Sequence, residues 1–548
     1  MGSTGSRWPL QRCGPFRCRC IAMACGMVCA SASHAMQLET GNDDVKMRWD
    51  NTIKYSNAFR LADRSEKLTE DVRTDDGDRN FGRGLISNRI DLLSEFDASY
   101  KNFGLRLSGA AWYDDVYNRR NDNNSPFTSN NLSVPYNEFT QETRDRMGRK
   151  AELLDSFVFL KGSLGDMAST ARLGRHSLVF GESLFFGANG IANAQGPIDL
   201  VKALNVPSSQ FKEILRPVNQ VSGQIQLTPN LSAQAYYQLK WEKTILPPAG
   251  SYLSTSDITG EGAESAAPGG VFPRGPDIKA SNSGQGGLQV RKRFTELDTE
   301  VGVFAARYND KTPNIYLTLN PITFAPANLV HTYAEGIRTY GMSFSTAVGT
   351  SNVAGEMSIR DNVPLVSGPQ VVVAGVANNS DHPAYAVGKT AHANLSLVNV
   401  LEASPLWQGG VLLAEVAWNR RLSIASNAQA MDPNTTRDAW ATRVVFAPSY
   451  FQVRPGLDIS VPIGLGYNPR GRSSSVFAFN GGAERGGDFS VGLTGEYEQV
   501  WQFSITYTQY FGREQSLLTP PNSPTAVLSF GQPLRDRTFL ALSIKRTF

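Results

Sequence analysis

The stretch Trp501-Gln-Phe-Ser-Ile-Thr-Tyr-Thr508 alternates aromatic or aliphatic side chains with polar ones at every step. Residues 89–98 and 231–243 repeat the pattern. Successive side chains of a β-strand point to opposite faces, so each stretch predicts a strand with one apolar and one polar face. A charge that faces lipid at the bilayer midplane costs roughly 2–4 kcal/mol. We therefore expect the apolar face to meet lipid and the charged face to line a lumen.

The spacing of these stretches extends the prediction to the whole chain. Eighteen of them can be marked between residue 45 and Phe548, and the gaps between them alternate strictly between long and short. Long gaps include 61–84, 118–151, 181–218, 245–285, 309–333, 362–390 and 512–535, and short gaps include Lys101–Phe103, Thr228–Asn230, Thr295–Glu296, Val348–Ser351 and Glu498–Val500. This rhythm predicts an all-β fold, a closed transmembrane antiparallel up-and-down barrel of about 18 strands, with about 16 as the alternative. Nine long gaps and eight short ones place both chain ends on the short-turn, periplasmic side.

The first 35 residues have the composition of a secretory signal peptide. Residues 1–20 hold four arginines and no acid, and Ile21–Ala32 is a short apolar run. The run is too short to span a bilayer, and cleavage after Ala35 would suit signal peptidase. A lipoprotein leader at Cys25 is the alternative. We expect residues 1–35 to be removed and residues 36–548 to form one barrel domain in a Gram-negative outer membrane.

The cysteines and the charges exclude several classes of protein. All five cysteines lie in the leader, so the mature chain could form no disulfide, thiolate metal site or thiol nucleophile, and we expect no cofactor. Without the four leader arginines the chain has 49 basic and 50 acidic residues. This balance gives no indication of nucleic-acid binding.

The width of the barrel raises the question of what fills it. A barrel of about 18 strands leaves an aqueous channel unless something blocks it. The gaps 181–218, 309–333 and 362–390 carry more apolar side chains than solvated loops should. They could pack on one another as a lid, or fold inward and line a constriction. For residues 191–217 we predict the inward constriction, with helix-like spacing over Pro197–Leu204.

We predict that side chains of gap 181–218, both apolar and charged, contact the transported molecule. The candidates are Phe185, Phe186, Ile198, Leu204, Phe211, Lys212, Glu213 and Arg216.

The last strand carries an assembly signal. Leu540, Leu542, Ile544 and Phe548 alternate with small or polar residues, and the chain stops on Phe548. Terminal strands of this kind are what the barrel assembly machinery recognises, so we predict that machinery as a partner and Phe548 as the decisive residue. The other surroundings expected for such a barrel are outer-membrane lipid and lipopolysaccharide.

The sequence contains few residue patterns that could support catalysis. After the leader only His176, His331, His382 and His392 remain, and no Gly-x-Ser-x-Gly motif or His-x-x-x-His zinc spacing occurs. His176 and Ser177 are neighbours on a strand and point to opposite faces, so they cannot form a Ser–His pair. We therefore expect no enzyme, and a packed or lumenal His176.

The first long gap contains an acidic cluster. Asp75, Asp76 and Asp78, with Asp71 nearby, could offer oxygen ligands to Ca²⁺. The spacing is not that of an EF-hand, and Arg73 and Arg79 lie among the acids. A solvated loop with internal ion pairs is therefore the alternative interpretation.

The lumenal charges leave two classes of function open. The basic residues on the charged faces, such as Lys240 and Arg291, are matched by acids such as Glu300 and Glu415. Mixed signs argue against strong ion selectivity and also suit ion pairing across the wall. The first class is a conduit, either a channel for hydrophobic or amphipathic small molecules or a general porin. The second is a non-conducting surface barrel, an adhesin or a partner of an exporter.

Several stretches also resemble a known family. They are Lys46-Met-Arg-Trp-Asp-Asn-Thr-Ile-Lys-Tyr55, Asp75-Asp-Gly-Asp-Arg-Asn-Phe81, Gly109-Ala-Ala-Trp-Tyr-Asp-Asp-Val-Tyr117, Arg172-Leu-Gly-Arg175, Gly181-Glu-Ser183, Lys212-Glu213 before Pro217, Ser254-Thr-Ser-Asp257, Gly341-Met-Ser-Phe-Ser345 and Asp536-Arg-Thr-Phe539. Across residues 36–548 the chain resembles the proteobacterial outer-membrane family catalogued as domain of unknown function 1302. One departure is Gln195-Gly-Pro197-Ile-Asp199, where the family pattern would have Asn-Pro-Val-Asp.

The resemblance implies an outer-membrane barrel that passes or exports hydrophobic compounds. Such families occur beside inner-membrane exporters of the resistance-nodulation-division type and a second envelope family. It therefore implies an exporter and a periplasmic protein as partners, and it implies no catalytic residues.

Overall fold

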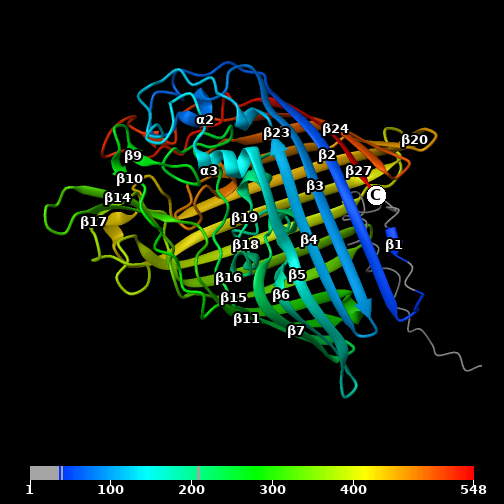
Figure 1. Ribbon diagram of the computed structural model, residues 1–548. Coiled ribbons are helices and arrows are strands. Elements are labelled where there is room, and N and C mark those ends of the chain that lie inside the picture. The colour runs from blue at the N-terminus through cyan, green and yellow to red at the C-terminus, as the bar shows by residue number, and fades with distance from the viewer. Residues whose placement is uncertain (1–35, 39–40, 206–209) are drawn as a thin grey trace, which may run out of the picture.

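The computed structural model describes residues 36–38, 41–205 and 210–548, in which one antiparallel sheet closes on itself (Figure 1). The predicted leader, residues 1–35, lies outside the described residues. The wall strands are β2 (Val45–Arg60), β3 (Gly84–Tyr100), β4 (Phe103–Asp114), β5 (Arg149–Leu164), β6 (Met167–His176), β7 (Val218–Thr228), β8 (Leu231–Gln238), β11 (Gly286–Phe294), β12 (Thr299–Tyr308), β15 (Ile337–Val348), β16 (Ser351–Pro364), β18 (Val387–Val400), β19 (Gly409–Ser426), β20 (Asp438–Arg454), β21 (Leu457–Ser460), β22 (Ile463–Arg470), β23 (Gly487–Tyr497), β24 (Trp501–Phe511) and β27 (Phe539–Thr547).

β21 and β22 are two halves of one wall strand, since each pairs with both β20 and β23. Counted in this way, the described residues form a closed barrel of eighteen strands, which confirms the predicted fold and strand number. The seam closes between β2 and β27, in a register that runs from Thr52 opposite Thr547 to Arg60 opposite Phe539. A short strand, β1 (Met36–Leu38), extends the sheet beside β2.

The connections lie at two distinct ends. The long ones gather at the left and top of Figure 1, and the short turns, β1 and the C-terminus lie at the right. We call these the long-loop end and the short-turn end. An even number of strands requires both chain ends to emerge on the same side, as the rhythm of the sequence predicts.

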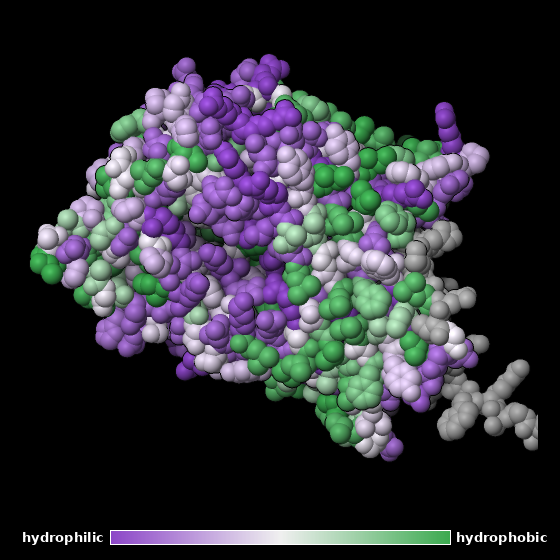
Figure 2. All heavy atoms as spheres, viewed as in Figure 1, coloured by the Kyte–Doolittle hydropathy of each residue, from purple (hydrophilic) through white to green (hydrophobic). Residues whose placement is uncertain are grey.

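The two faces of the wall differ in chemistry. Ile90 and Leu92 of β3 and Tyr340 and Met342 of β15 are exposed on the outside, whereas the side chains between them point into the barrel. Figure 2 shows hydrophobic residues over the wall toward the short-turn end and mainly hydrophilic residues over the long loops. The apolar outer band is the surface that a lipid bilayer requires.

Short elements build the long-loop end. They are α2 (Asp76–Arg79), η1 (Val116–Asn118), α3 (Gln141–Thr143), η2 (Arg144–Gly148), η3 (Ile191–Ala194), α4 (Leu200–Asn205), α5 (Phe211–Ile214), β9 (Ser265–Ala267), β10 (Val271–Pro273), β13 (Asn314–Leu319), β14 (Pro326–Thr332), β17 (Gln370–Val373), η5 (Ala428–Ala430), η6 (Phe479–Gly481), β25 (Leu518–Thr519) and β26 (Val527–Leu528); η4 (Thr295–Leu297) lies in a short turn.

Among the described residues, no helix is long and apolar enough to cross a membrane.

The long loops pack on one another and so bury many of their apolar residues. β13 pairs antiparallel with β14 and parallel with β17, so gaps 309–333 and 362–390 share one small sheet. A second apolar cluster gathers Phe81, Tyr117, Phe139, Tyr252 and Leu534 from four connections. Gaps 309–333 and 362–390 therefore pack together at the long-loop end, whereas the gap after β6 takes a different path.

Candidate functional site

The connection between β6 and β7, described over residues 177–205 and 210–217, lies against the inner face of the barrel, and we call it the inner loop. It contains η3, α4 and α5. Its hydrogen-bond partners on β16, β18 and β19 point inward, because the residues between them, such as Met357, Ile359 and Val416, are exposed on the outer face. The inner loop therefore crosses the lumen to reach the far wall.

A buried glutamate of β16 holds both ends of the first half of the loop. The Glu356 carboxylate accepts the backbone N–H of Glu182 at 2.6 Å and that of Ile191 at 3.0 Å. Glu356 is only 6 % exposed. One buried side chain thus accepts two backbone N–H groups that lie nine residues apart, and this contact fixes the path of residues 182–191.

A second glutamate repeats the arrangement on β19. The Glu415 carboxylate accepts the backbone N–H groups of Phe185 and Phe186, the latter at 2.9 Å. Its other oxygen accepts the Asn394 side-chain amide of β18 at 2.7 Å. The two phenylalanines are therefore held at the wall by their backbone, and their rings are left to pack.

The carbonyls of the same segment are held by a buried arginine. Arg360 of β16 donates to the carbonyls of Asn189 at 2.7 Å and of Gly190 at 2.6 Å. The side chain of Asn189 lies between Asn394, at 2.8 Å, and Asn419, at 3.1 Å. Glycine is required at 190, because a Cβ there would lie 2.0 Å from Oε1 of Glu356.

The second half of the loop is held near β5, β8 and the connection after β12. Arg216 forms a bidentate pair with Glu152 of β5, at 2.9 and 3.1 Å. Gln238 of β8 donates to the Gln195 carbonyl. Lys311 lies 3.4 Å from the carbonyls of Asn193 and Ala194, and burial lowers the pKa of its ammonium to about 8.

An apolar patch lines the lumen where the loop meets β19 and β20. Val411, Leu413, Val445 and Ala447 are buried on the inner face and contact Leu184 and Phe185 of the inner loop, with Val398 of β18 beside them. Phe186 packs with Ala417, Ala439, Ala441 and Phe479. Leu184 and Phe185 are only half-buried, so part of this surface is open to the lumen.

The wall on the other side of the barrel is charged and paired. Arg106 of β4 contacts Asp97 of β3 at 2.8 Å and Asp155 of β5 at 3.5 Å, and it also contacts Glu95. Arg291 lies 3.0 Å from Glu300 and 3.4 Å from Glu182 of the inner loop. These contacts favour the ion-pairing interpretation of the mixed lumenal charges.

The structure brings only some of the predicted contact residues to the wall. Phe185 and Phe186 lie at the apolar patch, and Arg216 meets a wall acid. Ile198 packs against a buried cluster inside the loop that contains Phe211. Leu204 packs against the cluster of the long loops. Lys212 is exposed, and Glu213 caps α5 through the Gln210 N–H at 3.2 Å. The role of all eight as substrate contacts stays a prediction.

The sequence predicts Glu356 and Glu415 as lumenal charges but not as contacts of the inner loop, and it does not single out Arg360 or Asn189. Glu356 and Arg360 are four residues apart on one strand, hence on one face, which marks them as lumenal charges. No pattern in the chain indicates that their partners are backbone groups of a loop about 170 residues earlier. The departure at 195–199 keeps Asp199, whose carboxylate accepts the Lys202 N–H at 3.0 Å and so caps α4.

The acidic cluster of the first loop divides in two. Asp78 turns toward Arg60, at 2.7 Å, and Arg537, at 3.4 Å. Asp75 and Asp76 instead meet Asp257, with one ligand oxygen of each residue within 4.8 Å of the others. Asp75, Asp76 and Asp78 are all buried, so the interpretation as a solvated loop is wrong, although Asp71–Arg73 and Asp75–Arg79 are ion-paired as expected.

His176 has a structural environment. Its ring lies 2.8 Å from the Ser222 hydroxyl of β7 and 3.1 Å from the Gly174 carbonyl, not beside Ser177. The Phe157 ring covers it, with the ring centroids 5.4 Å apart. The hydrogen bonds of this histidine involve a hydroxyl and a carbonyl, which is not the orienting carboxylate that a Ser–His–acid triad uses.

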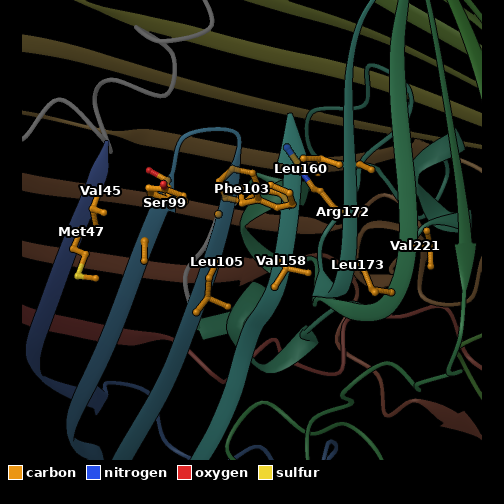
Figure 3. A pocket seen from close by; sticks show the side chains of 15 residues that line it. Val45, Met47, Ser99, Phe103, Leu105, Val158, Leu160, Arg172, Leu173 and Val221 are labelled. Carbon is orange, nitrogen blue, oxygen red and sulfur yellow. The ribbon is translucent and has the colours of Figure 1, made fainter. Parts of the chain in front are cut away.

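One depression on the described surface lies outside the barrel. It has a volume of about 510 Å³ and is lined by side chains of β2 to β7, including Val45, Met47, Leu105, Val158 and Leu173 (Figure 3). Leu105 alternates with Arg106 of the charged inner wall, so the depression belongs to the lipid-facing surface. It is therefore not part of the lumen.

Comparisons with known proteins identify the family of this chain. A family model described as "Protein of unknown function (DUF1302)" matches residues 17–548. No curated protein matches the chain.

Among solved structures, OccAB1 of Acinetobacter baumannii is 10 % identical with a TM-score of 0.43, covering 94 % of this chain and 98 % of that chain. OccAB3 of the same organism is 8 % identical with a TM-score of 0.42, covering 92 % and 99 %. OpdK of Pseudomonas aeruginosa, solved with vanillate, is 10 % identical with a TM-score of 0.39, covering 92 % and 98 %. Likenesses this distant carry no argument about function, which has to rest on the geometry.

Proposed function

This chain belongs to the DUF1302 family, and from its barrel we propose that it is an outer-membrane channel for hydrophobic or amphipathic small molecules. A closed barrel with an apolar outer band satisfies every backbone group within a bilayer, which is why such barrels can span outer membranes. The short-turn end would then face the periplasm and the long-loop end the outside.

The observation that carries the proposal is the inner loop. Glu356, Glu415 and Arg360 tie residues 182–191 to the wall by buried, charge-assisted hydrogen bonds. A loop held in this way narrows a wide barrel to a defined passage without closing the sheet itself. In our proposal the inner loop is the constriction, and the molecule in transit passes between it and the wall.

The apolar patch supports an amphipathic substrate. Half-buried Leu184, Phe185 and Val398 present hydrocarbon to the lumen, whereas the wall around Arg106 presents paired charges. A passage with one apolar and one polar side suits molecules that have both. An inner-membrane exporter of the resistance-nodulation-division type, with a periplasmic protein, would deliver such molecules to the short-turn end, where both chain ends lie.

A general porin is the plainer version of the same proposal. The second class, a non-conducting surface barrel, is favoured by one observation: the long loops pack into buried clusters and a shared sheet instead of leaving a clear opening. A measurement of conductance separates the two classes.

The first prediction tests the constriction in planar bilayers. We replace Ile191–Pro217 by a Gly-Ser linker too short to reach from the far wall back to Val218, so that residues 182–190 must leave Glu356, Glu415 and Arg360. We expect the single-channel conductance and the uptake of a bulky antibiotic to rise several-fold, because the shortened connection can no longer cross the lumen. The substitution Phe185→Ser should instead slow the passage of a hydrophobic solute and leave ion conductance nearly unchanged.

The matched control is Phe127→Ser, a phenylalanine that is 68 % exposed in the connection between β4 and β5. It should change neither property. If the barrel conducts nothing before or after the loop is replaced, the channel proposal is wrong and the surface-barrel class remains. If Phe185→Ser and Phe127→Ser behave alike, the apolar patch does not contact the solute.

A further inference from the structure

Three long connections meet around the first turn of α2, at the long-loop end and away from the inner loop. Asp75 and Asp76 come from residues 61–83, Asp257 from residues 239–285, and Asn123, Thr128 and Asn130 from residues 115–148. One ligand oxygen from each of the three aspartates lies within 4.8 Å of the other two. The three carboxylates are 1 %, 3 % and 0 % exposed.

The donors around this group are unevenly distributed. Asp76 accepts from Thr128 at 2.6 Å, from Asn130 at 2.9 Å and from Asn123 at 3.2 Å. Oδ2 of Asp257 accepts the Asp76 backbone N–H at 3.2 Å, but its Oδ1 is fully buried with no hydrogen-bond donor. Oδ1 of Asp75 is equally buried and also lacks a donor. Two carboxylate oxygens in the group are therefore left without a partner.

The charges of the group do not balance. Three carboxylates stand against one guanidinium, that of Arg79, which pairs with Asp75. The other nearby arginines are engaged elsewhere, Arg73 with Asp71 and Arg60 with Asp78. Buried charge without compensation is costly, so a group like this needs either protons or a cation.

We propose that Asp75, Asp76 and Asp257 bind a divalent cation, with Ca²⁺ as the matching ion, and that this ion joins the long loops over the barrel. Ca²⁺ prefers oxygen ligands and tolerates irregular geometry, whereas Mg²⁺ demands near-octahedral coordination and keeps several waters. A site with three fully buried carboxylates leaves little room for those waters. The side chains of Asn123, Thr128 and Asn130 orient Asp76 through the hydrogen bonds already described.

The close approach of the loops fits a joint rather than an accidental contact. A Cβ at Gly77, next to Asp76, would lie 2.4 Å from the Ser254 carbonyl oxygen and 2.7 Å from that of Ser251. Asn130 ties the same corner together, because its amide donates both to Asp76 and to the Asp257 carbonyl, at 2.9 and 3.1 Å. The ion therefore binds where residues 61–83, 115–148 and 239–285 already converge.

Burial and mutual repulsion act in the same direction on the protons of the group. They raise the pKa of Asp75 to about 7 and that of Asp257 well above the ordinary range, and burial raises the pKa of Asp76. Shared protons are thus the alternative to a bound ion. The two differ in whether Ca²⁺ alone changes the protein.

The test uses the full barrel refolded without lipopolysaccharide, because lipopolysaccharide itself binds Ca²⁺. We titrate CaCl₂, and separately MgCl₂, by isothermal calorimetry, and follow tryptic cleavage of the long loops at each concentration. We expect one Ca²⁺ per barrel, weaker Mg²⁺ binding and slower cleavage with Ca²⁺. Asp257→Asn should weaken Ca²⁺ binding by about tenfold or more, since even supporting groups around a metal contribute about 10–100-fold in affinity.

Asp63→Asn is the matched control, an acid in the same first connection whose side chain is 79 % exposed. It should bind Ca²⁺ as the unaltered protein does. Should Asp257→Asn not refold, Asp75→Asn is measured in its place. Equal Ca²⁺ binding by the site variant and the control, or no Ca²⁺ binding by the unaltered barrel, would overturn the proposal and leave proton sharing. Neither result concerns conductance, so the test of this inference is independent of the test of the proposed channel.

Discussion

At the scale of the residue, buried polar side chains decide which loop goes where. Glu356, Glu415 and Arg360 lie on wall strands whose outer faces are apolar, and each satisfies backbone groups of the inner loop. Each would be costly to bury alone, because an unpaired charge in a low-dielectric site loses its hydration. Wall and loop therefore stabilise each other, and the chemistry of a few side chains selects one loop for the lumen.

A buried histidine of β14, in the small sheet of the long loops, has a pKa below its ordinary value. His331 of β14 accepts a hydrogen bond from Arg274 on Nδ1, at 3.0 Å, and donates from Nε2 to the Ile258 carbonyl, at 3.2 Å. Burial, with the charge of Arg274 second, lowers its pKa from 6.5 to about 4, while Asp277 opposes the shift and Lys243 adds to it. Only the neutral ring can accept from Arg274.

The second prediction follows from the sign of this shift. Because the folded pKa lies below the unfolded value, the histidine's contribution is complete above pH 6.5 and is lost as the pH falls toward 4. Amide exchange of residues 326–332, corrected for the intrinsic rate, should therefore quicken across that range. His331→Asn, whose amide can accept from Arg274 but does not titrate, should flatten the dependence; an unchanged profile would contradict the assignment.

At the scale of the element, β27 has two neighbours and therefore closes the barrel. It pairs with β24 on one side and with β2 on the other. Phe548 follows it directly, and its backbone exchanges hydrogen bonds with Asn51, at 2.8 and 2.9 Å. Its side chain is 45 % exposed, like that of an outer-face residue.

The third prediction concerns assembly. Phe548→Asp should leave the chain misassembled and degraded, because the change places a charge on the lipid-facing end of the strand that closes the seam. Thr547→Asp is the control: Thr547 bonds to Thr52 at 2.9 Å on the lumenal side, where a charge is tolerated. The measurement is the yield of heat-modifiable barrel from outer membranes, and a normal yield from Phe548→Asp would refute the assignment.

At the scale of the whole molecule, the barrel separates two kinds of surface. The long-loop end carries buried clusters, a three-stranded sheet and the aspartate group, whereas the short-turn end carries β1 and the C-terminus. For an asymmetric barrel of this kind we expect one orientation in a membrane, with the long loops outside.

The fourth prediction tests this orientation. Residues 36–548 contain no cysteine, so a single introduced thiol can be labelled selectively. Val376→Cys, at a position that is 69 % exposed after β17, should react with a membrane-impermeant maleimide on intact cells. Asn230→Cys, in the exposed turn between β7 and β8, should react only after the outer membrane is permeabilised. Labelling of Asn230→Cys on intact cells would reverse the topology.

The sequence by itself determined the wall. Alternation with a period of two residues places side chains on two faces, and the alternating gap lengths predict the number of strands, their antiparallel order and the side on which the chain ends emerge. These properties depend on neighbours along the chain or on adjacent strands, so a local pattern carries them. The composition of residues 181–218 also showed that this segment is too apolar to remain in water, because exposed hydrocarbon surface is unfavourable whichever surface finally covers it.

Only the tertiary structure decided which surfaces cover which. Apolar composition alone could not tell the inner loop from gaps 309–333 and 362–390, which share a sheet at the rim instead. The difference lies in Glu356, Glu415 and Arg360, which meet their partners across about 170 to 230 residues of chain. The sequence grouped Asp78 with Asp75 and Asp76, whereas the structure places Asp257 beside them, from a connection about 180 residues later in the chain. Contacts between distant segments depend on the closure of the whole barrel, and no spacing in the sequence encodes that distance.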